Sequence, residues 1–369
     1  MTESNALRKL NAAGQSVWYD NIQRSMLDGE LATMIERDDL RGITSNPSIF
    51  EKAITGSDHY DDALRQALAA DAAGAQDSRA LFYNLAIDDI QRAADQLLPV
   101  YQRTDGVDGM VSLEVSPDLA HDTDATVREA RELHARLARP NVMIKVPATR
   151  AGLPATEQLI AAGINVNVTL LFAVERYEAV AEAYLKGLEQ RHAQGQSLER
   201  IASVASFFVS RVDSALDPLL AERCPELQGT IALANAKQAY QRYLALFGSA
   251  RFDRLRAAGA RPQRLLWAST STKNPAYPEL LYVEGLIGPD TVDTMPPATY
   301  ATFRASGQVS PTLTQDIDQA QSQLQALHEH AIDLAAITDR LEAEGVAAFA
   351  QSFTNLLQAI EAKAARVAA

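Results

Sequence analysis

The feature that most constrains the fold of this 369-residue chain is a regular alternation of short β-like segments with longer helix-like stretches. Strands that alternate with helices form parallel βαβ units. Eight such units in a chain of this length predict a single (β/α)8 TIM barrel. A doubly wound open sheet is the alternative, but no Gly-rich dinucleotide-binding motif follows the first strands. The predicted strands are Ser16–Tyr19, Gly42–Ser45, Met110–Val115, Val142–Val146, Ile164–Thr169, Ser203–Val209, Leu265–Ser269 and Thr291–Met295.

Two stretches exceed what a minimal barrel needs, and both are predicted to be helical. Residues 210–264 are expected to hold at least two helices between the sixth and seventh strands, and residues 312–369 a helical extension interrupted at Gly345. In the last helix, an apolar stripe that includes Phe349 and Phe353 indicates packing on the barrel. A role for this helix in covering an active site is the second interpretation. We therefore expect one barrel domain over residues 1–369, with 312–369 packed on it.

Composition excludes several classes of function. The chain has 47 acidic and 34 basic residues, a formal charge of −13, which repels nucleic acids but permits a local phosphate pocket. The single cysteine, Cys224, cannot form an internal disulfide or a Cys-based metal site, and the six histidines suggest no metal site. No apolar run approaches the roughly 18–20 residues that span a bilayer, and the N-terminus shows no signal-peptide pattern. We expect a cytoplasmic protein without membrane contact.

The alternation of side chains along three consecutive strands places polar groups on one face. Val111, Leu113 and Val115 alternate with Ser112 and Glu114, Lys145 alternates with apolar neighbours, and Asn167 and Thr169 do the same on the fifth strand. Apolar faces of barrel strands turn towards the surrounding helices and the other faces turn inwards. The pattern therefore predicts that Glu114, Lys145, Asn167 and Thr169 point into one lumen.

A lysine and a carboxylate inside a barrel have two interpretations. A structural ion pair between Lys145 and Glu114 would only fill space, and branched apolar side chains normally do that better. Burial disfavours the charged ammonium form of a lysine, so the second interpretation is a neutral amine that attacks a carbonyl carbon. We favour the second, with Glu114 moving protons and Thr169 orienting a water molecule.

Three segments resemble the transaldolase family. Arg41–Phe50, built around Thr-Ser-Asn-Pro, is similar to the first family motif; Ile144–Leu159 resembles the Schiff-base lysine motif, and Gly163–Phe172 resembles the fifth-strand segment. The motifs occur in order, each on a predicted strand, and the resemblance covers roughly residues 15–300.

The resemblance implies a cofactor-free enzyme of the pentose phosphate pathway. Its sugar-phosphate substrates would be sedoheptulose 7-phosphate or fructose 6-phosphate as donors, and glyceraldehyde 3-phosphate or erythrose 4-phosphate as acceptors. The implied roles are Lys145 as the Schiff-base nucleophile, Asp20 as the acid and base of carbon–carbon cleavage, Glu114 and Thr169 as the pair that handles water, and Asn46 and Asn167 as partners of the substrate hydroxyls. Two of these residues have simpler alternatives: Asp20 as a helix N-cap and Asn46-Pro47 as a turn.

Phosphate recognition departs from the family pattern. Ser206, Phe208 and Arg211 lie in a segment similar to the family's sixth strand, although Ser210 stands where Gly often precedes the arginine. An exposed ion pair between Arg211 and Asp213 is the alternative.

Ser269 aligns with a family serine after the seventh strand, but Ser271 occupies the position of a family arginine. Lys273 is the nearest substitute, as a point donor of charge.

Three functions remain open at this stage. The first is the transferase, as a monomer or homodimer. The second is a fructose-6-phosphate aldolase-like lyase that releases dihydroxyacetone; such lyases are shorter, and Asp20 favours transfer. The third is a non-catalytic sugar-phosphate-binding barrel, which the intact lysine, carboxylate and threonine positions oppose.

Overall fold

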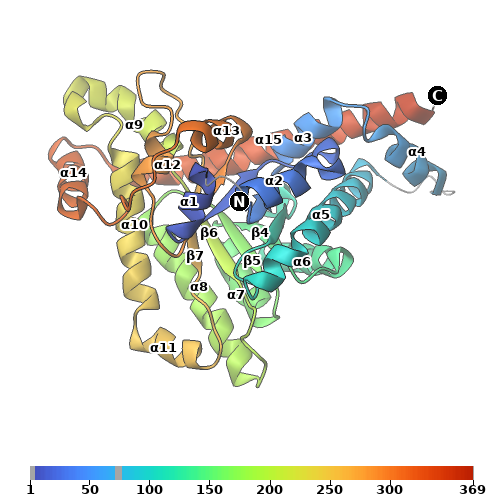
Figure 1. Cartoon of the computed structure of the whole chain (residues 1–369), viewed down its shortest axis with the longest axis horizontal. Coiled ribbons are helices and arrows are strands. Elements are labelled where there is room, and N and C mark those ends of the chain that lie inside the picture. Colours follow the sequence, from blue (N-terminus) through green and yellow to red (C-terminus); the bar gives the residue numbers. More distant parts are fainter. Residues whose placement is uncertain (1–4, 71–76, 369) are drawn as a thin grey trace.

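The computed structural model describes residues 5–70 and 77–368, and eight parallel strands close into a barrel at its centre (Figure 1). Each strand pairs with the next in chain order, and the last pairs with the first. The predicted (β/α)8 fold is confirmed. The strands are β1 Gln15–Asp20, β2 Gly42–Thr44, β3 Met110–Glu114, β4 Val142–Pro147, β5 Val166–Leu171, β6 Ser203–Phe208, β7 Arg264–Ala268 and β8 Thr291–Met295.

The fifth strand differs from its prediction at both ends. It begins two residues later, at Val166, because Gly163 adopts a positive φ of 86° and Asn165 turns its side chain to accept a hydrogen bond from the Ala202 amide, at 2.9 Å. It then continues to Leu171 through a register shift against β6, in which Leu170 has a φ of +62°. A bulge of this kind redirects side chains at the rim of a barrel.

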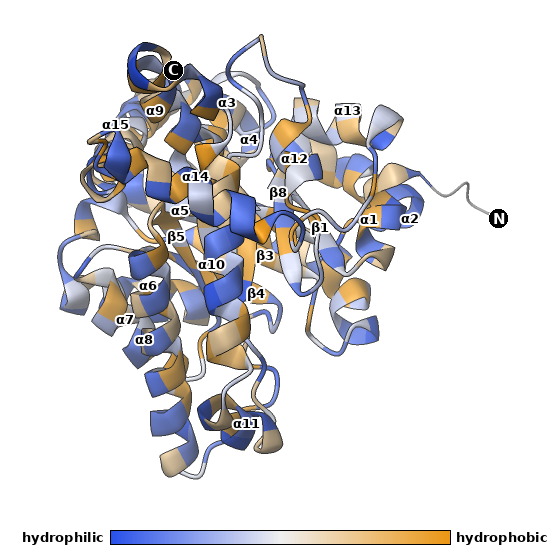
Figure 2. Ribbon diagram, turned by 90° about the vertical axis from the view of Figure 1, so that its left-hand side faces the viewer, coloured by the Kyte–Doolittle hydropathy of each residue, from blue (hydrophilic) through white to orange (hydrophobic). Residues whose placement is uncertain are grey.

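Helices surround the barrel, and their outer faces are hydrophilic while their inner faces bury apolar side chains (Figure 2). They are α1 Ala6–Ala12, α2 Glu30–Asp38, α3 Pro47–Thr55, α4 Asp61–Ala70, α5 Ser78–Arg103, α6 Thr123–Leu137, α7 Gly152–Ala161, α8 Val174–Ala193, α9 Ser210–Arg223, α10 Ile231–Phe247, α11 Ala250–Ala257, α12 Leu281–Gly285, α13 Pro297–Ser306, α14 Ile317–Glu329 and α15 Leu334–Ala368. Short 3₁₀ segments are η1 Arg24–Asp28, η2 Pro117–Leu119 and η3 Pro225–Leu227. Among the helices described, none is long and apolar enough to cross a membrane.

The last helix, α15, runs across the molecule past α3 (Figure 1). It is continuous through Gly345, so the predicted interruption there is wrong. Gly345 lies against Leu170 so closely that a Cβ atom would meet the Leu170 Cδ2 at 2.9 Å, and the missing side chain serves close packing rather than a break. Phe349 and Phe353 of the predicted stripe are buried, and so are Leu356 and Ile360 further along the same helix.

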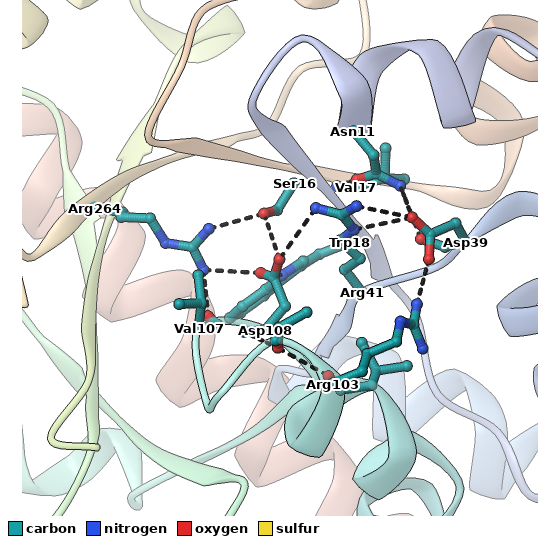
Figure 3. Close-up of polar contacts among 12 residues, drawn as sticks. Asn11, Ser16, Val17, Trp18, Asp39, Arg41, Arg103, Val107, Asp108 and Arg264 are labelled. Atoms are coloured by element: carbon teal, nitrogen blue, oxygen red, sulfur yellow. Dashed lines mark hydrogen bonds and ion pairs between the residues drawn. The ribbon is translucent and has the colours of Figure 1, made fainter. Parts of the chain in front are cut away.

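A network of charged side chains around the buried Asp108 joins the N-terminal ends of several strands (Figure 3). The Asp108 carboxylate, which precedes β3, accepts hydrogen bonds from Ser16 Oγ at 2.8 Å and Arg264 Nη2 at 2.9 Å. Arg41 Nη1 lies 3.5 Å from its Oδ2. Because these partners come from β1, from β7 and from the residue before β2, one carboxylate links several strands at the end of the barrel away from the catalytic candidates.

Candidate active site

The strand ends that carry the predicted polar residues surround a cavity of about 460 Å³. Active sites of (β/α)8 enzymes lie at this carboxyl end of the strands. The residues that line the cavity are Asp20, Asn21, Gln23, Thr44, Asn46, Ser48, Ile49, Lys52, Ala53, Lys145, Thr169, Ser206, Phe208, Arg211, Ala268, Ser269, Ser271, Lys273, Thr294, Pro296, Pro297 and Phe349.

Lys145 and Glu114 lie side by side on β4 and β3. The strand register pairs Glu114 with Lys145 and Lys145 with Asn167, so the three polar side chains form one row, as the alternation predicted. Both charged side chains are buried, and Lys145 Nζ lies 3.6 Å from Glu114 Oε2. Since 3.6 Å is too long for a hydrogen bond, the amine donates instead to the Ser45 carbonyl oxygen at 3.1 Å.

Glu114 lies where ionisation is unfavourable. Burial is the main cause that raises its pKa to about 7, with Lys145 opposing the rise and Asp20 adding to it. Within the described residues, Glu114 Oε2 and Thr169 Oγ1 are both buried without a hydrogen-bond partner. Two buried oxygens without a hydrogen-bond partner, one of them 3.6 Å from the Lys145 amine, suit a reaction in which water is released and consumed.

Asp20 ends β1 and lines the same cavity as Lys145. Its Oδ1 accepts a hydrogen bond of 2.6 Å from Thr44 Oγ1, and Thr44 in turn contacts Thr294 Oγ1 at 2.6 Å. Burial raises the pKa of Asp20, while the positive charges of Lys145 and Arg211 oppose that rise. The helix N-cap alternative is wrong, because the next helical segment, η1, begins only after Gln23 and has no side-chain cap.

The two candidate amides have different surroundings. Asn167 is fully buried, donates through Nδ2 to Ser112 Oγ at 3.1 Å and accepts through Oδ1 from Ser206 Oγ at 2.7 Å. Asn46 lines the cavity and also caps α3, because its Oδ1 accepts from the Ile49 amide at 3.0 Å. The Asn46 Oδ1 therefore has the structural role of a helix cap, close to the turn alternative. Its Nδ2 has no hydrogen-bond partner among the described residues.

The candidate phosphate contacts gather on one wall of the cavity. Arg211 packs its guanidinium over the Phe208 ring, 5.2 Å from the centroid. The predicted alternative, an ion pair with Asp213, is wrong, because Asp213 is buried and accepts hydrogen bonds from the Ala232 amide and the Tyr282 hydroxyl.

The loop after β7 completes this wall. Ser269 has a φ of +57°, and its Oγ lies 3.0 Å from Ser210 Oγ. Lys273 Nζ donates to Ser271 Oγ at 2.6 Å. Burial is the main cause that lowers the pKa of Lys273, and the positive charge of Arg211 lowers it further.

Comparison with known proteins places this geometry in a family. A family model described as transaldolase/fructose-6-phosphate aldolase matches residues 17–360. The chain belongs to this family. Among curated relatives, it is 47% identical to a transaldolase of Parafrankia sp., with 97% of each chain covered. It is also 47% identical to a transaldolase of Thiobacillus denitrificans, covering 96% of this chain and 99% of that one, and 44% identical to transaldolase 2 of Nostoc punctiforme, covering 98% of both.

Seven polar or aromatic residues that line the cavity of this transaldolase-family barrel were not predicted as site residues from the sequence: Asn21, Gln23, Thr44, Ser48, Lys52, Thr294 and Phe349. A signal existed for Lys52, because Asn46 as N-cap and Pro47 at the first helical position predict a helix. On that helix, Ile49, Lys52 and Ala53 share a face. Phe349 belonged to the predicted apolar stripe, but the spacing of apolar residues does not predict that it packs near Lys145. The Phe349 ring centroid lies 5.7 Å from Lys145 Nζ.

The described residues contain no group of three or more His, Cys, Asp or Glu side chains that could hold a metal ion. Cys224 is a buried thiol.

Proposed function

We propose that this transaldolase-family chain is a transaldolase that moves a dihydroxyacetone unit from a ketose phosphate to an aldehyde through a Schiff base on Lys145. The observation that carries the proposal is the buried Lys145 amine, 3.6 Å from Glu114 Oε2 and in one cavity with Asp20. Donors are sedoheptulose 7-phosphate or fructose 6-phosphate, and acceptors are glyceraldehyde 3-phosphate or erythrose 4-phosphate. The names of the curated relatives support this assignment.

In the first step, Lys145 Nζ attacks the ketose carbonyl carbon and the resulting carbinolamine loses water. A group with a pKa near neutrality exchanges protons most readily at neutral pH. Glu114, whose pKa is raised to about 7, supplies the proton that the leaving hydroxyl needs, and Thr169 Oγ1 orients the departing water. Hydrolysis of the final imine uses the same two groups in reverse.

In the second step, the Asp20 carboxylate removes the proton of the C4 hydroxyl. The C3–C4 bond breaks, its electron pair flows into the iminium to form an enamine, and the aldehyde leaves. Attack of the enamine on an incoming aldehyde reverses these events, and Asp20 returns the proton. Asn46 and Asn167 hold the hydroxyls of the three-carbon unit, since neutral amides bind hydroxyls without adding charge.

The substrate phosphate binds on the wall formed by Ser206, Phe208, Arg211, Ser269 and Lys273. Stacking on Phe208 orients the planar Arg211 guanidinium, whose fork matches phosphate oxygens. Phe349, whose ring centroid lies 5.7 Å from Lys145 Nζ, keeps bulk water from the enamine.

Borohydride reduction tests the proposal directly, because it converts a lysine imine into a stable amine. We expect fructose 6-phosphate to label the parent protein, and Lys145→Ala to lose the label while keeping its far-UV circular dichroism spectrum. Lys186→Ala on α8, where the ammonium is half exposed and pairs with Glu182, is the matched control and should label normally. Persistent labelling of Lys145→Ala would assign the nucleophile to another lysine.

The family also includes fructose-6-phosphate aldolases, so the reaction without an acceptor is the discriminating assay. A transferase stops after one equivalent of aldehyde per active site, whereas a lyase continues and accumulates dihydroxyacetone. Accumulation over many turnovers would identify the lyase instead.

We assign the enzyme to the non-oxidative pentose phosphate pathway in the cytoplasm, as a monomer or homodimer, without a cofactor and without nucleic-acid or membrane partners. We also propose that residues 1–369 form one domain with 312–369 packed on the barrel; residues 1–4, 71–76 and 369 lie outside the described residues.

A further inference from the structure

Lys52 is a cation of the active-site cavity to which the proposed mechanism gives no role. It lies on α3, lines the cavity and is exposed. Within the described residues its ammonium makes no hydrogen bond or ion pair. A long cationic side chain without a carboxylate partner at the mouth of a substrate cavity is free to bind an anionic ligand.

Lys52 enters the cavity from the side opposite to the other phosphate candidates. It follows β2, while Arg211 follows β6 and Lys273 follows β7. In a closed ring of eight strands in chain order, β2 and β6 are four strands apart and face each other across the barrel. Positive side chains therefore flank the cavity on two walls, with Asp20 on β1 as the acid that lines it.

The charge of the substrate phosphate indicates why positive side chains on a second wall of the cavity would strengthen binding. A phosphate monoester carries about 1.5 to 2 negative charges at neutral pH. Arg211 and Lys273 supply two positive charges on the wall after β6 and β7, and the nearby Asp20 carboxylate offsets part of the Arg211 charge. Lys52 adds a further positive charge from the opposite wall, where it can help to balance the dianion.

We propose that Lys52 is a specificity-determining residue that contacts the substrate phosphate from the α3 wall, opposite Arg211 and Lys273. This inference rests on the proposed function. The phosphates of a six-carbon and a seven-carbon ketose lie one carbon apart when both are joined to Lys145. A lysine on a four-carbon stem can follow that displacement, whereas an arginine fork held by stacking cannot. Lys52 therefore lets one site accept both chain lengths.

The test compares Lys52→Ala and Lys52→Arg with the parent, with Lys186→Ala as the control. For Lys52→Ala we expect the KM for fructose 6-phosphate to rise about tenfold, equivalent to about 1.4 kcal/mol, with kcat changed less than about twofold. The inhibition constant of inorganic phosphate should rise by a similar factor. Lys52→Arg should restore much of the binding of fructose 6-phosphate, because the positive charge remains.

A comparison of acceptors separates phosphate binding from a general effect. With glyceraldehyde 3-phosphate as acceptor, Lys52→Ala should show the raised KM; with unphosphorylated glyceraldehyde, it should match the parent. Equal losses for both aldehydes, or unchanged phosphate inhibition, would overturn the assignment. Borohydride labelling of Lys145 at saturating ketose is measured in parallel: its presence in the parent keeps the proposed function intact when the Lys52 inference fails, and its absence overturns both.

Discussion

Asp20 is a partly buried carboxyl group and Glu114 a buried one, both near one amine, and their surroundings separate their roles. Asp20 keeps a hydrogen bond from Thr44 and lies near the positive charges of Lys145 and Arg211, whereas Glu114 Oε2 has no hydrogen-bond partner in the described part of the chain. Carboxyl groups in unequal environments titrate apart, which is how one site assigns an acid and a base. The better-solvated Asp20 suits proton removal from a hydroxyl, and Glu114 suits proton exchange with water.

Asp20→Ala tests this division of roles. We expect the substitution to slow carbon–carbon cleavage by about 10²–10⁴-fold, the usual contribution of a positioned acid or base. Imine formation, which needs Lys145 and Glu114, should slow much less. Single-turnover borohydride trapping measures the imine, and aldehyde release measures cleavage. A parallel fall in both rates would show that Asp20 acts before the bond breaks.

The surroundings of Asp293 on β8 predict that the stability of the folded protein depends on pH. It is fully buried, its only hydrogen bond among the described residues comes from Thr270 Oγ1 at 3.0 Å, and burial raises its pKa from the ordinary value of 3.8 to about 8. The folded protein therefore holds a proton that the unfolded chain releases. The stability that this proton contributes is full below pH 4 and is lost as the pH rises towards 8.

Asp293→Asn removes the titration and keeps the hydrogen-bond acceptor. At pH 8.5 we expect the Tm of the variant to be several degrees higher than that of the parent. At pH 5 we expect a smaller difference between the two Tm values. Thermal unfolding at the two pH values measures this change, with Asp62→Asn, an exposed aspartate, as the control. An equal difference at both pH values would contradict a buried neutral carboxyl group.

At the scale of elements, helix α15 is the part that a minimal barrel lacks and that the cavity uses. Its contact with Leu170 depends on Gly345, and Phe349, one turn later on the same face, lies over Lys145. Ser352, further along, accepts a hydrogen bond of 2.7 Å from Ser48 on α3. The helix is therefore held against both the fifth strand and the segment that contains Asn46 and Lys52.

Gly345→Ala should change activity and helix stability in opposite directions. The added methyl group meets Leu170 Cδ2 at 2.9 Å, so α15 or Leu170 must shift and move Phe349 away from the amine. We expect kcat/KM to fall several-fold, although alanine favours a helix by about 1 kcal/mol over glycine. Steady-state kinetics would be compared with Gln351→Ala, an exposed substitution on the same helix. Unchanged kinetics in Gly345→Ala would show that the position of Phe349 does not matter.

At the scale of the whole molecule, residues that stabilise the barrel and residues proposed for catalysis lie at opposite ends of the strands. The carboxyl ends of the strands hold the cavity, and the Asp108 network joins the amino ends (Figure 3). A buried carboxylate with arginine partners leaves uncompensated charge when it is removed. The two ends can therefore be altered independently.

Asp108→Ala should lower the free energy of unfolding by about 3–5 kcal/mol, because Arg264 would remain nearly buried without its partner. Urea unfolding measures the loss. Asp62→Ala removes an exposed carboxylate that pairs with Arg65, and it should change stability by less than about 0.5 kcal/mol. At temperatures where Asp108→Ala stays folded, borohydride labelling of Lys145 should equal that of the parent, and a specific loss of labelling would link the two ends.

The number, order and approximate bounds of the strands could be predicted from the sequence, as could the row of Glu114, Lys145 and Asn167. Each depends on side-chain alternation within a strand, which the local backbone determines. The resemblance of three motifs added the proposed roles, and the structure brings most of those residues into one cavity. The bulge at Leu170 was missed, since it arises from the pairing of β5 with β6 rather than from residues in β5 alone.

Only the tertiary structure decided which distant segments complete the cavity. Phe349 lies about two hundred residues after Lys145 in the chain, and Lys52 faces Arg211 only because the barrel closes and places β2 opposite β6. The periodicity of apolar residues predicts which face of a helix is buried. It does not predict which surface packs against that face, because many surfaces can pack against the same apolar stripe. The partner is selected by the packing of the whole chain, here by a close contact between Gly345 and Leu170 that an added Cβ atom would displace.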